Sequence, residues 1–82
     1  MGYYIQNTGL SMKYFLLLWV CSAMHGTCLS PPITKPIPFN THYECVNAGY
    51  IDGMKLVQTM GREVVEKNRF FIAFNCKPET SI

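Results

Sequence analysis

The chain has 82 residues, which is enough for one small domain. It is 49% hydrophobic and 15% charged, with a formal net charge of +2, and this composition excludes a disordered polar chain. Basic and acidic residues alternate between positions 52 and 69, so they form a mixed, solvated surface. Nucleic-acid binding requires clustered basic residues, and we therefore expect no nucleic-acid partner.

An apolar run near the N-terminus is typical of a secretory signal peptide. Met12 and Lys13 precede the 11 residues YFLLLWVCSAM, and small residues follow this run. The run is too short for a transmembrane helix, which needs about 20 apolar residues. We predict a signal peptide over residues 12–28, cleaved between residues 23 and 28, that sends the protein to the periplasm or outside the cell.

Two features of this region have alternative interpretations. Residues 1–11 carry no charge and no pattern, so we interpret them as a mis-called N-terminal extension, the alternative being an unusual polar leader. The apolar segment could also stay uncleaved and anchor the protein to the membrane, or Cys28 could carry a lipid. Beyond this segment, we expect no contact with a membrane.

Residues 29–40 form a proline-rich linker, with prolines at positions 31, 32, 36 and 38. Proline fixes φ and lacks a backbone donor, so neither a helix nor a central strand is expected here. We predict an extended spacer. A role as a ligand for an aromatic groove is the less favoured alternative.

The main helix is predicted to begin at Thr41. Thr41 and Glu44 have the spacing of a capping box, in which each side chain bonds a free backbone donor at the helix start. Apolar residues and glycine then recur at helical spacing, and this stripe comprises Val46, Tyr50, Gly53, Val57, Met60 and Val64. Gly49 and Gly53 indicate close packing of another backbone against this helix. We expect a break at Gly61 and a short helical turn that ends at Lys67.

A strand is predicted over residues 69–76, followed by a polar tail over residues 78–82. Phe70, Ile72, Phe74 and Cys76 alternate and therefore share one face of this strand. One strand cannot satisfy its own backbone groups, so it needs a partner. The partner could be residues 33–39 or a second molecule, which would make the protein a homodimer through the strand edge. The predicted fold is a small disulfide-stapled α+β domain over residues 41–77, with one main helix packed on a short strand or hairpin.

The four cysteines suggest one structural disulfide. A domain of this size usually needs such a cross-link, and an exported protein meets an oxidising environment. We predict a bond between Cys45 and Cys76, whereas Cys21 would leave with the signal peptide. Cys28 could instead pair with Cys45 or Cys76, stay free, link two chains or be removed by cleavage.

Two chemical sites are possible but not favoured. His25 and Cys28, and likewise His42 and Cys45, form two H-x-x-C units that could together hold zinc. The proline-rich linker separates these units, and the first lies in the predicted cleavage region. Cys45 with His42 as its base lacks a third residue to orient the histidine. We therefore predict no metal site, no cofactor and no catalytic residue.

The order of these features resembles small secreted proteins of unknown function from marine bacteriophages, cyanophages in particular. The resemblance rests on Cys21-Ser-Ala, a cysteine before Pro31-Pro32, Tyr43-x-Cys45-x-x-x-Gly49-Tyr50, Gly61, and a closing Phe70-x-x-x-Phe74-x-Cys76. Gly53 departs from the small polar residue expected there. The resemblance implies a phage source and no mechanism. We expect a non-catalytic accessory protein that binds a protein partner, for example in the host envelope, and the alternative is a membrane-anchored protein that acts on the envelope.

Overall fold

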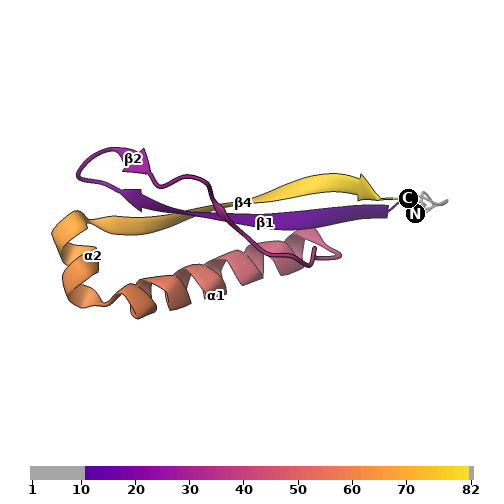
Figure 1. The fold of residues 1–82 in the computed structure, drawn as a ribbon. Helices are drawn as coiled ribbons and strands as arrows, with labels where there is room; N and C mark the ends of the chain where they lie inside the picture. The colour runs from indigo at the N-terminus through magenta and orange to yellow at the C-terminus, as the bar shows by residue number, and fades with distance from the viewer. Residues whose placement is uncertain (1–10, 82) are drawn as a thin grey trace.

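The computed structural model describes residues 11–81, which form a sheet with a long helix along one face (Figure 1). The elements in chain order are β1 (Ser11–Ser22), β2 (Thr27–Cys28), β3 (Ile33–Thr34), α1 (His42–Met60), α2 (Arg62–Asn68) and β4 (Phe70–Ser81). Helix α1 packs against the strands, and α2 turns the chain back into β4 (Figure 1). The predicted α+β class is therefore confirmed.

A long antiparallel pair of strands, β1 and β4, forms the main part of the sheet, with β1 in the centre and β4 at the edge. The two strands pair along their whole length, from Ser11 opposite Ser81 to Ser22 opposite Phe70. The C-terminal strand thus has β1 as its partner, which corrects the expected pairing with residues 33–39. The homodimer through the strand edge stays a prediction. The expected polar tail is also corrected, because the strand continues to Ser81.

The proline-rich linker lies along the other edge of β1. It contributes the two-residue strand β3, in which Ile33 is opposite Leu18, and its Phe39 forms an isolated bridge with Tyr14. β2 pairs with the end of β1 that is nearest the turn. The linker is therefore paired with β1 over part of its length instead of being only a spacer.

β1 coincides with the apolar part of the predicted signal peptide. Its Leu16 is fully buried and its Leu18 is 3% exposed, and both belong to the core. Cleavage between residues 23 and 28 would remove β1, so a cleaved chain cannot form this sheet. The signal peptide over residues 12–28 stays a prediction. The predicted extension over residues 1–11 lies outside the described residues apart from Ser11, which begins β1.

Among residues 11–81, no helix is both long and apolar enough to cross a membrane.

All four cysteines form disulfide bonds. Cys45 is bonded to Cys76, the pair expected from the sequence, and Cys21 is bonded to Cys28. The second bond corrects the expectation that Cys21 is removed and Cys28 is left over. Its physical reason is the turn over residues 23–26, which places Cys28 directly opposite Cys21 in the β1–β2 pair. Gly26 has a φ of 68° in this turn, a conformation that favours glycine.

The helices begin and end close to the predicted residues. α1 has Thr41 as its N-cap, and Gly61 separates it from α2 with a φ of 90°, which glycine adopts without steric cost. α2 ends at Asn68, one residue after the predicted end. The predicted N-cap at Thr41, the break at Gly61 and the short second helix are therefore confirmed, whereas of the two capping-box bonds only the one accepted by Thr41 Oγ1 is formed.

Candidate binding groove

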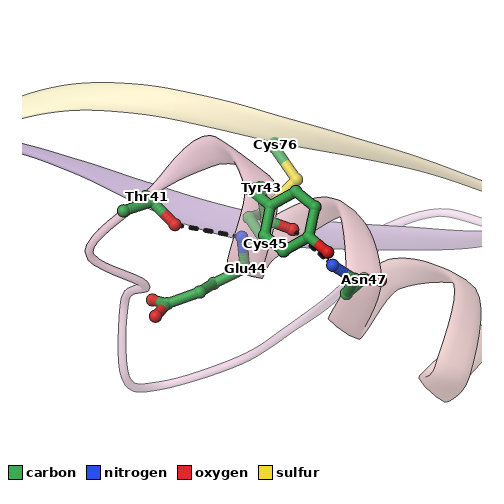
Figure 2. The surroundings of a disulfide bond; sticks show 6 residues. All are labelled: Thr41, Tyr43, Glu44, Cys45, Asn47 and Cys76. Carbon is green, nitrogen blue, oxygen red and sulfur yellow. Dashed lines mark hydrogen bonds between the residues drawn. A yellow bond between two sulfur atoms is a disulfide. The ribbon is translucent and has the colours of Figure 1, made fainter.

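The first turn of α1 is closed by an N-cap and is bonded to β4 by a disulfide (Figure 2). The backbone N–H of Glu44 donates to Thr41 Oγ1 at 3.1 Å, which satisfies one free donor of the helix start. Cys45 lies one residue further, is fully buried, and bonds to Cys76 with a Cα–Cα distance of 6.0 Å. This distance is ordinary for a disulfide, so the bond holds the helix at a normal packing distance from the strand.

Two glycines bring the middle of α1 close to β4. A Cβ on Gly49 would lie 2.5 Å from the ring of Phe74, and a Cβ on Gly53 would lie 3.3 Å from Ile72 Cγ2. The close neighbours are thus side chains of β4, which corrects the expectation that another backbone packs there. Because Phe74 and Ile72 fill the space under the glycines, α1 lies close against β4.

A groove runs between α1 and β4, and we call it the β4 groove. Its volume is about 490 Å³, within the usual range of ligand-binding clefts. Helix α1 forms one wall and β4 forms the other. The lining residues are Gly49, Tyr50, Gly53, Met54, Val57, Gln58, Phe70, Phe71, Ile72 and Phe74.

The β4 groove is apolar and uncharged, and several of its side chains are open to solvent. Tyr50 is 70% exposed, Met54 56% and Phe71 48%. The ring of Tyr50 meets that of Phe74 edge to face, with centroids 5.0 Å apart, so its position is set by the strand. No lining residue carries a formal charge. The groove therefore suits an apolar, uncharged ligand.

The backbone of β4 has a free edge beside this groove. Within residues 11–81, β4 pairs with β1 alone. On β1, the carbonyls of Leu16 and Val20 accept hydrogen bonds from the opposite side, from the N–H groups of Lys35 and Leu29. Even-numbered residues of β1 therefore direct their backbone groups away from β4, as alternation in an antiparallel ladder requires.

The register carries this alternation over to β4. Leu16, Leu18 and Val20 lie opposite Cys76, Phe74 and Ile72. These pairs are the non-hydrogen-bonded pairs of the ladder, so the N–H and C=O groups of Ile72, Phe74 and Cys76 point to the free edge. Three successive even-numbered residues thus offer backbone donors and acceptors next to an apolar groove.

Pro78 shows where this free edge ends. It lies opposite Tyr14, whose N–H and C=O both bond to Phe39 on the far side. The missing N–H of Pro78 therefore falls on the free edge, where proline is tolerated in a strand. Lys77 and Glu79 flank it and form an exposed ion pair with Nζ and Oε2 3.4 Å apart. Proline and charged side chains are common ways to block pairing at an exposed edge, so the available stretch ends at Cys76.

The less favoured chemical sites are not assembled. Cys28 and Cys45 belong to different disulfide bonds, so neither offers a thiolate to zinc or to a substrate. Within the described residues, no three His, Cys, Asp or Glu side chains are grouped closely enough to hold a metal ion.

The β4 groove itself did not emerge from the sequence. The predicted apolar stripe of the helix includes Tyr50 and Val57, whereas Met54 lies outside it. A signal was nevertheless present, because Tyr50, Met54 and Val57 follow one another at steps of four and three. This second, overlapping stripe makes the apolar face of α1 wider than β4 alone can cover.

No protein-family model, curated protein or solved structure matches the chain. The resemblance to secreted phage proteins therefore stays a prediction.

Proposed function

We propose that this chain is an exported accessory protein that acts by binding another protein and not by catalysis. The observation that carries the proposal is the β4 groove, in which solvent-exposed Tyr50, Met54 and Phe71 border an unpaired strand edge. Exposed aromatic residues and methionine are enriched at the centres of protein interfaces. The resemblance to phage proteins supports a target in the envelope of the host.

The two disulfide bonds indicate an oxidising environment, because thiols are kept reduced in most cytosols. We infer secretion or the periplasm as the location. In this fold the apolar segment of residues 12–28 has a second role, because it supplies β1. An export route that leaves this segment in place is therefore compatible with the structure, whereas one that removes it is not.

Fractionation of an exporting bacterial host tests the exported location that this function requires. The full chain should be found outside the cytoplasm, and an alkylating reagent added before lysis should modify none of its four cysteines. A cytoplasmic chain with modified thiols would contradict the proposal.

The second candidate function is a membrane-anchored protein that keeps its apolar segment in the bilayer. The continuous apolar run within β1 is the observation that favours it. Carbonate extraction separates the two candidates. A chain folded around β1 should be released from membranes at alkaline pH, whereas an anchored chain should stay with them.

A further inference from the structure

We propose that the β4 groove binds a short, extended, uncharged and apolar segment of a partner protein, which pairs with β4 as an added antiparallel strand. The proposal rests on the binding function above and identifies the chemistry of the partner. Addition of a strand to an exposed sheet edge is a general mode of peptide recognition. Main-chain hydrogen bonds then supply affinity, and pockets for alternate side chains supply specificity.

The free edge fixes the length of the bound segment. Backbone groups available for pairing come from Ile72, Phe74 and Cys76, and Pro78 ends the stretch. β4 itself begins at Phe70, directly after α2. An added strand therefore has room for about seven residues, which span about 23 Å at the usual rise of a strand.

The groove fixes the chemistry of the bound side chains. Alternate residues of the added strand would point toward α1, where Tyr50, Met54 and Val57 form the wall. A charged side chain there would lose its hydration without gaining a partner, since no lining residue is charged. We therefore expect apolar residues at every second position of the segment and no charge among them.

A second copy of this chain fits the edge less well than a different partner. Antiparallel pairing of two β4 strands over the whole free stretch, residues 70–76, has its twofold axis at Ala73. This register brings Arg69 of each copy close to Lys77 of the other, and like charges opposite each other on neighbouring strands are destabilising. A shift in one direction places Pro78 in the paired stretch, and a shift in the other runs into α2.

A displayed library of random nine-residue segments provides the first probe for this site. We expect selection on the full oxidised chain to enrich uncharged segments with apolar residues at alternate positions. Two variants then locate the binding surface. Met54→Glu places a charge in the groove wall, whereas Ile51→Glu is the matched control, because Ile51 is 48% exposed on the same helix and does not line the groove.

Measured by titration calorimetry, Met54→Glu should weaken binding of an enriched peptide about tenfold or more, and Ile51→Glu should change it less than about twofold. Backbone methylation of the peptide tests the strand pairing itself. Methyl groups on the alternate nitrogens that face β4 should each weaken binding about three- to tenfold, because each removes one hydrogen bond. Methyl groups on the other alternate nitrogens should have little effect.

Each remaining outcome would overturn the proposal. Equal effects of the two methylation patterns would show that the peptide does not pair with β4. Peptide binding that is unaffected by Met54→Glu would leave the proposed binding function intact but move it to another surface. Selection without any enriched pattern would show that the edge binds no strand-like peptide. A dimer in sedimentation equilibrium that Met54→Glu dissociates would show that the edge binds a second copy of the chain. Failure of the exported location that the proposed function requires is seen separately, in the cell fractionation.

Discussion

The two disulfide bonds should contribute unequally to stability, and removal of each one tests how the fold is held together. In the chain-entropy model, the cost of removing a disulfide grows with the length of the loop it closes. Cys45 and Cys76 are 31 residues apart, for which the model gives about 3.7 kcal/mol. Cys21 and Cys28 are 7 residues apart, for which it gives about 2.4 kcal/mol.

Burial acts in the same direction. Cys45 is fully buried and Cys76 is 8% exposed, and their bond joins α1 to β4. Cys21 is buried, but its partner Cys28 is exposed in the short strand β2. Removal of the Cys45–Cys76 bond therefore removes the covalent link between the helix and the sheet, whereas removal of the Cys21–Cys28 bond affects only the β1–β2 turn.

The assay is urea unfolding of the oxidised chain and of two double alanine variants, one for each disulfide pair. The model difference of about 1.3 kcal/mol corresponds to a midpoint shift of about 1 M urea in a chain of this size. If the Cys45/Cys76 variant is unfolded in water, all three proteins are compared in the same concentration of a stabilising osmolyte. A Cys21/Cys28 variant that unfolds at the same or lower urea concentration than the Cys45/Cys76 variant would refute the reasoning.

Five further substitutions, two of them comparison variants, test single contacts by urea unfolding. Gly49→Ala should cost about 1–3 kcal/mol, because its Cβ would lie 2.5 Å from a β4 phenylalanine ring. Gly53→Ala should be nearly neutral, since its looser contact of 3.3 Å is offset by a gain in helix propensity of about 1 kcal/mol. Leu16→Ala should cost about 2–5 kcal/mol and exposed Met12→Ala less than about 1 kcal/mol. Equal effects of the two variants would show that β1 does not contribute Leu16 to the core. Thr41→Ala should cost about 1 kcal/mol through loss of the N-cap, and no change would mean that the cap is unimportant.

The helical part of the fold was predictable because its signals are local. A capping residue, a stripe at helical spacing and a glycine with positive φ determine α1, the break and α2 within a few residues of one another. The Cys45–Cys76 bond followed from similar reasoning, since a small exported domain needs a cross-link and these two cysteines lie near the ends of the helix and strand. The helix signals depend little on the rest of the chain, whereas the disulfide also requires that the break at Gly61 bring the strand back along the helix.

β1 was not predictable as a strand, because its sequence is apolar on both faces. Leu16 and Leu18 face α1, whereas Phe15, Leu17 and Trp19 alternate with them on the opposite face and are partly buried there. Such a strand reads as a continuous apolar run, and so does the central part of a signal peptide. Periodicity alone cannot separate the two, and the interpretation of residues 12–28 as a signal peptide then concealed the partner of β4.

The pairing of Cys21 with Cys28 and the β4 groove were missed for the same reason. If residues 12–28 are interpreted as a signal peptide, Cys21 is expected to be removed by cleavage, and Cys28 then has no obvious partner. The free edge of β4 likewise becomes visible only when β1 occupies the other edge. Both features are consequences of a long-range pairing that no local pattern in the sequence specifies.

The most direct test of the fold is the intact mass of the protein from an exporting bacterial host, with peptide mapping before and after reduction. We expect a chain that retains residues 12–28, in which Cys21 is linked to Cys28 and Cys45 to Cys76. All four cysteines should react with an alkylating reagent only after reduction. A mature chain that begins between residues 24 and 29 would have lost β1 and would contradict this structure, and so would a full-length chain with free thiols.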